Sequence, residues 1–371
     1  VWFAKEEIDD FENSPNLSNE LRNCTFVYDD SLLFYCCGFR HRGSRAFRSG
    51  FGRLPYPNKD CGFRIEFNAD QRFGNRESIN LDSMDVEDAV RSPLQERTAY
   101  WLFRKMGLPN SRQQYLRLIV NGRLGRVYED VQRVDRAYID AWFPEDDDGH
   151  LHKASGKAKK GIKLDAVHPL IAETHRWSFG KRCQRNNDDW QPFLTLVRSL
   201  NEPAMGEKYK ESIENTILPR QWLRVLAIRH LLGDWDCYGS HRGKNMYFYF
   251  APKREKWYLL PWDIDFAFGT GRDWNDELPL LDGSGFPEVA KLLSDKGYGK
   301  LYWSALEDLT QGPWQSSYGS DAPPTAMDQF LDDSARVLAA EGYPDERHEK
   351  IKEFIVKRRN FVLQILNAKK E

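Results

Sequence analysis

Side chains of the kinds that hold metals and move protons are concentrated in two stretches of the chain. Residues 233–245 read Gly-Asp-Trp-Asp-Cys-Tyr-Gly-Ser-His-Arg-Gly-Lys-Asn, and residues 261–269 read Pro-Trp-Asp-Ile-Asp-Phe-Ala-Phe-Gly. Carboxylate and amide oxygens gathered at one point suit a hard cation such as Mg²⁺ or Mn²⁺. A carboxylate that does not hold the metal is able to orient a hydroxyl nucleophile and accept its proton.

A hairpin is predicted to bring the two stretches together. Residues 245–250 and 257–261 are rich in aromatic and apolar residues, as strands are, and a short polar turn separates them. Antiparallel pairing across that turn places Asn245 opposite Trp262, one residue from Asp263. The loop that precedes the hairpin enters at the same end, so carboxylates distant in sequence are expected to converge with one amide.

Two other interpretations of these acids stay open. Aspartates in such loops also cap turns and bond their own backbone, with no further role. Clustered carboxylates that hold metal would equally serve a metal-dependent phosphoesterase.

A second constellation is basic and lies in the first half of the chain. Residues 40–50 read Arg-His-Arg-Gly-Ser-Arg-Ala-Phe-Arg-Ser-Gly, and Lys59 and Arg64 follow. Guanidinium groups beside a Gly-Ser turn are able to cradle phosphates, although the same stretch also reads as a solvated face. A nucleic-acid surface is disfavoured because 54 Lys and Arg against 56 Asp and Glu leave a net charge of −2.

The elements that must position these residues suggest an α+β protein in two parts. A length of 371 residues corresponds to about two domains. We expect a strand-rich part over residues 1–160, with a helix at 94–106 and a hairpin around Asn121-Gly122. A loop-like stretch at 144–163 leads to a helical part over residues 161–371, in which the hairpin above is the one exception. Helices are expected at 220–232, from the capping box Thr325-x-x-Asp328 onward, and over 351–366.

Other classes of protein are not supported by the composition. No run of 18 apolar residues occurs, so no transmembrane helix is expected. The 6 cysteines have no zinc-site spacing. The first residues have no apolar signal region, as expected for a processed protein or an excised domain.

These strings together resemble the spore-coat protein H (CotH) kinase family. The resemblance runs over about residues 35–270, and it is most specific at the last two segments. The matching segments are 42–44 (Arg-Gly-Ser), 63–67 (Phe-Arg-Ile-Glu-Phe), 103–109 (Phe-Arg-Lys-Met-Gly-Leu-Pro), 120–128 (Val-Asn-Gly-Arg-Leu-Gly-Arg-Val-Tyr), 233–236 (Gly-Asp-Trp-Asp), 245–249 (Asn-Met-Tyr-Phe-Tyr) and 261–269.

The resemblance implies an α+β, two-lobed atypical protein-kinase-like fold, with a strand-rich nucleotide-binding N-lobe and a mainly helical C-lobe. Members use ATP with Mg²⁺ or Mn²⁺ to phosphorylate Ser or Thr of exported proteins, such as spore-coat proteins. An exported or cell- or spore-surface location is implied in the same way.

The resemblance also implies roles for particular residues. Asp236 matches the catalytic base, and Asn245 and Asp263 match the metal ligands. Beside them, we expect Asp265 to be an additional ligand or to support the ligands from behind. Basic residues of the nucleotide lobe correspond to Arg42, Lys59 and Arg64.

A non-catalytic surface binding module or pseudokinase with the same fold is the alternative. The family tends to carry Glu four residues after Tyr128, where this chain has Gln132, and a Lys-Lys pair where only Lys59 stands. The retained aspartates and Asn245 favour an active enzyme.

Overall fold

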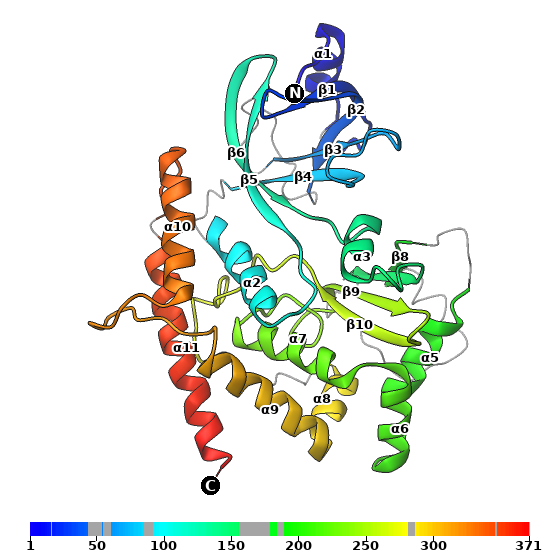
Figure 1. The fold of residues 1–371 in the computed structure, drawn as a ribbon, viewed down its shortest axis with the longest axis vertical. Helices are drawn as coiled ribbons and strands as arrows, with labels where there is room; N and C mark the ends of the chain where they lie inside the picture. Colours follow the sequence, from blue (N-terminus) through cyan, green and yellow to red (C-terminus); the bar gives the residue numbers. More distant parts are fainter. Residues whose placement is uncertain are drawn as a thin grey trace. The chain divides into compact units, whose positions relative to one another are not determined.

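Helices and strands of this chain fall into two compact units in a computed structural model (Figure 1). The structure describes residues 1–15, 17–43, 54, 61–84, 92–155, 179–183, 189–280, 286–345 and 347–370. The first unit comprises Val1–Pro93 and Ser111–Ala141, and the second comprises Leu94–Asn110 and Trp142–Glu371. The domain boundary expected at residue 160 lies outside the described residues and stays a prediction.

The first unit is built on a six-stranded antiparallel sheet with the strand order β1-β2-β3-β4-β6-β5. Alternation sets its two faces: Phe63 and Ile65 are buried in the aromatic core, while Arg64 between them lies on the polar face. The elements are α1 (Lys5–Asn13), β1 (Arg22–Tyr28), β2 (Leu32–Arg42), β3 (Gly62–Glu66), β4 (Ser78–Ser83), β5 (Gln113–Val120), β6 (Arg123–Val131) and α3 (Arg136–Trp142).

The first three residues connect the two edges of this sheet. Trp2 pairs with Thr25 of β1 through two backbone hydrogen bonds, and the nitrogen of Val1 donates to the carbonyl of Ile119 in β5. Both edge strands therefore have backbone partners in the same short segment, which reduces the open edge available for unwanted pairing.

The second unit contains a smaller sheet surrounded by helices. Its four strands run in the order β10-β9-β7-β8, and all three pairs are antiparallel. The elements are α2 (Pro93–Lys105), β7 (His150–Ser155), β8 (Phe179–Lys181), α5 (Gln191–Leu200), α6 (Glu207–Thr216), α7 (Pro219–Leu231), β9 (Lys244–Ala251), β10 (Lys256–Pro261), α8 (Pro287–Ser294), α9 (Lys296–Gln311), α10 (Ala326–Ala340) and α11 (His348–Ala368).

Two expectations for this unit are corrected. The stretch 144–163 is not all loop, because β7 occupies residues 150–155, and the hairpin is not the only sheet structure, because β7 pairs with β9. Most residues of β7 are polar by type, yet His150 and His152 are buried together with the apolar Leu151 and Ala154. Its strand conformation is therefore set by pairing with distant segments, which overrides local preference.

The register expected for the hairpin is confirmed. Phe250 lies opposite Trp257, and Met246 lies opposite Pro261 at the other end of the ladder. Extending this register by one residue brings Asn245 to Trp262. The α+β class is confirmed as well, and the α2 helix begins and ends within one residue of the expected bounds.

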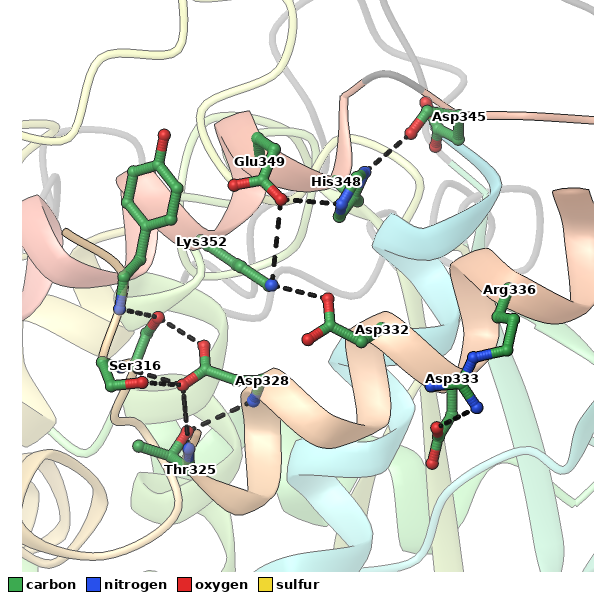
Figure 2. A network of polar contacts seen from close by, with 12 residues as sticks. Ser316, Thr325, Asp328, Asp332, Asp333, Arg336, Asp345, His348, Glu349 and Lys352 are labelled. Atoms are coloured by element: carbon green, nitrogen blue, oxygen red, sulfur yellow. Dashed lines mark hydrogen bonds and ion pairs between the residues drawn. The ribbon is translucent and has the colours of Figure 1, made fainter. Parts of the chain in front are cut away.

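The start of α10 is fixed by a dense polar network, which Figure 2 shows. The predicted capping box is present, with the Thr325 side chain accepting from the Asp328 nitrogen and the Asp328 carboxylate accepting from the Thr325 nitrogen. Ser316 and Ser317 also donate to Asp328. Burial alone would raise the pKa of Asp328, but these hydrogen bonds outweigh it and lower the pKa. On the same network, Lys352 of α11 pairs with Asp332 of α10 at 2.5 Å.

Among the helices of the described ranges, none is both long and apolar enough to cross a membrane.

Candidate active site

Asp236 and Asn245 are joined at the entrance to the β9–β10 hairpin. The side-chain amide of Asn245 donates to the backbone carbonyl of Asp236 at 2.9 Å and to its carboxylate at 3.2 Å. Both residues are buried, and Asn245 adopts a left-handed backbone conformation with φ of 59°. With its nitrogen engaged, Asn245 keeps its amide oxygen, a ligand for hard cations, without a hydrogen-bond donor among the described residues.

Lys244 contributes a cation that the sequence analysis did not single out. Its ammonium lies 2.5 Å from the Asp236 carboxylate, and its side chain is 36% exposed while that of Asp236 is 5% exposed. The lysine thus compensates the charge of a buried carboxylate from the solvent side. Its position next to Asn245 in the sequence was the available signal.

A buried ion pair fixes the loop between α7 and β9, which carries Asp236. Arg229 in α7 lies 2.7 Å from Asp234, and neither side chain is exposed. The same guanidinium donates to the carbonyls of Trp262 and Asn245, each at 3.2 Å. Arg229 therefore links three segments: the loop after α7, the start of β9 and the end of β10. An arginine within an apolar helix such as α7 was the sequence signal for a buried ion pair.

The helix α11 holds the end of α7 from another direction. Arg358 is buried and donates to the carbonyls of His230 and Leu231 at 2.7 and 3.2 Å. It also donates to the carbonyls of Asp276 and Leu278 at 2.6 and 2.5 Å. The first two bonds reach carbonyls in the last turn of α7, where a helix leaves carbonyls without partners inside the helix, and the other two join α11 to the segment around Asp276.

Asp263 lies among carboxylates. Asp263 is half-buried and forms no ion pair or side-chain hydrogen bond with any described residue. Like Asn245, it has a left-handed backbone conformation, with φ of 55°. The pKa of Asp234 shows the effect of the Asp263 charge. Burial raises the pKa of Asp234 to about 6, the nearby Arg229 opposes the increase, and the negative charges of Asp236 and Asp263 add to it. Asp263 is therefore within electrostatic range of the loop that carries Asp236.

Glu96 in α2 is a further member of this group, and the sequence analysis missed it. It accepts a hydrogen bond from the Ile264 nitrogen at 3.1 Å, which fixes the backbone between Asp263 and Asp265. Burial, and after it the charges of Asp263 and Asp265, raise the pKa of Glu96 to about 8. A glutamate on an otherwise buried helix face was the available signal.

The donor set fits a divalent cation that is bound together with phosphates. Within the described ranges, no three or more His, Cys, Asp or Glu are grouped closely enough to hold a metal by themselves. The predicted ligands are instead one amide, from Asn245, and the carboxylates of Asp263 and Asp265. Mg²⁺ at phosphate-transfer sites takes one or two carboxylates and completes its shell with phosphate and water oxygens.

Glu96→Gln is expected to stabilise the metal-free protein more strongly as the pH rises. The pKa of Glu96 is about 8 in the folded state, against about 4.3 for a free glutamate. Between these values only the unfolded state loses the proton from Glu96, so this group lowers the free energy of unfolding of the wild type as the pH rises. Glutamine carries no such proton. Melting temperatures in EDTA should therefore differ little near pH 4 and clearly at pH 8.

The control for this prediction is Glu353→Gln, which changes a half-exposed glutamate of α11 paired with Lys357. The prediction would be contradicted if the melting temperatures of wild type and Glu96→Gln differed by the same amount at pH 4 and pH 8.

The basic residues expected to contact the nucleotide lie on the first unit or outside the described residues. Arg42 forms an ion pair with Asp82, and Arg64 lies 3.0 Å from Glu66. Burial, with Arg133 nearby, lowers the pKa of Arg64 to about 10. Lys59 lies outside the described residues. The nucleotide-binding role of all three stays a prediction.

Gln132 has a structural role in the same unit. Its backbone nitrogen donates to the carbonyl of Arg112 at 2.8 Å, and its side-chain oxygen accepts from the Arg112 nitrogen at 3.2 Å. It therefore continues the β5–β6 pairing.

Two of the solved structures to which the chain is similar are distant likenesses. One is HipA in its complex with HipB and operator DNA, from the Shewanella oneidensis MR-1 toxin–antitoxin system, with 14% identity, a TM-score of 0.36 and 78% of this chain covered. The chain spans 57% of the length of that structure. The other is the proinflammatory kinase CtkA of Helicobacter pylori, with 11% identity and a TM-score of 0.37 over 87% of this chain and 93% of that one.

Comparison with curated proteins gives no match. The sequence pattern of the CotH kinase protein family, in contrast, matches residues 56–362, most of the chain. This range contains the loop after α7, the hairpin, and the segment of Asp263. The chain belongs to the CotH kinase family.

Proposed function

We propose that this chain transfers the γ-phosphoryl group of ATP to Ser or Thr hydroxyls of a protein, with Mg²⁺ or Mn²⁺ as cofactor. The observation that carries the proposal is the contact between Asp236, Asn245 and Lys244 at the mouth of the hairpin. A carboxylate fixed by an amide and an ammonium is placed to accept a proton from an incoming hydroxyl.

Asn245, Asp263 and Asp265 would hold the metal. When bound, the divalent cation would neutralise the phosphate oxygens of ATP and the charge that develops on them. After burial, the charges of Asp263 and its neighbours raise the pKa of Glu96 and Asp234, and a divalent cation bound there would relieve this crowding of carboxylates. Arg229 and Glu96 would keep these ligands in place through the backbone groups they bond.

The phosphates would be contacted by Arg42, Lys59 or Arg64. Arg42 pairs with Asp82, and Arg64 pairs with Glu66. Each guanidinium would therefore have to bind a carboxylate and a phosphate at the same time. Exported proteins with Ser or Thr acceptors are the proposed substrates.

A pseudokinase or surface binding module is the second candidate. It is favoured by Gln132, which bonds Arg112 rather than offering an acidic group, and by the carboxylate partners of Arg42 and Arg64.

Asp263→Ala is expected to abolish metal-dependent nucleotide binding, because the cation loses an anionic ligand that has no other partner among the described residues. Wild type should melt at a higher temperature with Mg²⁺ and ATP together than with either alone. A ligand at a hundred times its Kd adds about 2.7 kcal/mol to the free energy of unfolding. Thermal melting of both proteins, alongside transfer of labelled phosphate to a Ser-rich protein, measures this.

Asp333→Ala is the matched control, since Asp333 is an exposed residue of α10 whose ion pair within the described part of the chain is with Arg336. Wild type that binds the nucleotide but transfers phosphate to nothing, itself included, would favour the pseudokinase. Wild type that responds to neither metal nor nucleotide would exclude the kinase proposal.

A further inference from the structure

A cavity of about 220 Å³ lies beside the loop that carries the proposed base. One side is formed by Trp235, Ser240 and His241 of that loop, and the other by Arg272, Leu278 and Pro279. A water molecule takes about 30 Å³ in the liquid, so the cavity has room for a carboxylate or phosphate group with its hydration. All these residues belong to the second unit.

The cavity has a cation that no described residue neutralises. Arg272 is exposed and forms no ion pair or side-chain hydrogen bond within the described part of the chain. Its guanidinium lies over the Trp235 ring at 4.6 Å from the centroid, and Arg242 lies near the same ring at 6.0 Å. The indole therefore orients Arg272 and leaves its N–H groups for a ligand.

The one carboxylate among the described residues that line this cavity is Asp234, and it is already paired with Arg229. A second cavity of about 590 Å³ is also bordered by Arg272, but it has more carboxylates in its lining. Its lining includes Asp273, Asp276 and Glu353 beside Lys350 and Lys357, so it has both signs of charge. Of these two cavities, the smaller is the one whose described lining has a single carboxylate, Asp234, already paired with Arg229.

The position of the cavity relates it to the acceptor. Trp235 forms its wall and is followed directly by Asp236, the proposed base. An extended peptide advances about 3.3 Å per residue, so a peptide whose hydroxyl lay at Asp236 would bring the side chains next to that hydroxyl toward the wall formed by Trp235 and Arg272.

We propose that this cavity binds an anionic side chain, a carboxylate or a phosphate, one to three residues from the Ser or Thr acceptor. The chain would thus select acidic or already phosphorylated acceptor segments. This inference rests on the proposed function, because Asp236 defines where the acceptor lies.

Matched peptides with one Ser test the selection. The residue beside the acceptor is Asp, phosphoserine or Gln, and the Asp and phosphoserine arms distinguish the two sources of the anion. We expect kcat/KM for the better anionic peptide to exceed that for the Gln peptide about tenfold or more, chiefly through KM, as a hydrogen bond to a charged group allows. Arg272→Gln should remove this preference and leave the Gln peptide unchanged, while Arg272→Lys should retain part of it.

Arg336→Gln is the control, since Arg336 is an exposed arginine of α10. Equal kcat/KM for all peptides, unchanged in Arg272→Gln, would overturn the inference while the proposed function stands.

A binding experiment separates the two ideas. Each peptide is titrated calorimetrically into Asp236→Asn protein without ATP, with and without Arg272→Gln. If an anionic peptide binds only when Arg272 is present, the cavity binds anions as inferred. If the wild type also never transfers phosphate, the proposed kinase activity is rejected while anion binding by the cavity stands. Equal binding of anionic and Gln peptides would overturn the inference.

Discussion

Asp236→Asn is expected to lower phosphoryl transfer at least about a hundredfold while nucleotide affinity stays nearly the same, on the scale of a lost general base. Asparagine keeps the shape of the side chain and still accepts a hydrogen bond from Asn245, but it does not take a proton at neutral pH. It also leaves Lys244 without its carboxylate at 2.5 Å. The proposed metal ligands are not changed, so the metal–nucleotide complex should still form.

The measurement is labelled-phosphate transfer, run beside nucleotide titration of the same preparations. Lys244→Met is the informative companion, since it removes the ammonium and keeps the base. A transfer rate within a few-fold of wild type in Asp236→Asn would show that another group accepts the proton.

Asp234→Ala is expected to reduce the free energy of unfolding by about 3–5 kcal/mol, because it leaves a buried guanidinium without its counter-charge. Arg229 and Asp234 are both fully buried and lie 2.7 Å apart. The loss should extend to the site, because Arg229 also donates to the carbonyls of Trp262 and Asn245. Urea unfolding followed by circular dichroism measures the change.

Replacing both partners by apolar residues, in Asp234→Leu with Arg229→Met, should recover much of this loss, since no charge is then left buried. Asp333→Ala, which breaks an exposed pair, should change the free energy of unfolding by less than about 1 kcal/mol. A loss in Asp234→Ala no larger than in this exposed control would contradict the prediction.

Local signals in the sequence were sufficient for the parts of the fold that depend on neighbouring residues. The β9–β10 register follows from two aromatic runs separated by one short turn, and the start of α10 follows from Thr325 and Asp328 alone. In the same way, Asn121 and Gly122 both adopt the positive φ that a tight hairpin turn requires. Each of these features lies within one short continuous segment, the longest of them Lys244–Pro261.

Features that depend on distant residues were not predictable. Strand β7 has a mostly polar sequence, and its strand conformation depends on pairing with β8 and with β9, the latter about a hundred residues later. The importance of Glu96 is visible only when Ile264, 168 residues away, donates to it. Buried charges are tolerated only with such partners, and a single sequence does not reveal which distant segment supplies them.

The route of the chain through its two units has a consequence for biosynthesis. The chain leaves the first unit at Pro93, supplies α2 to the second, and returns at Ser111 to complete the first by Ala141. A 13-residue helix is marginal in isolation, and the partners of α2 at residues 264–270 are made much later. At about 5–20 residues per second, the delay from Glu96 to Ile264 is on the order of ten to thirty seconds. During that interval all residues of the first unit have been made, and Leu94–Asn110 interrupts them. The apolar side chains of this segment cannot yet pack against the second unit, which is still incomplete. This segment is where we expect chaperones to engage the nascent chain.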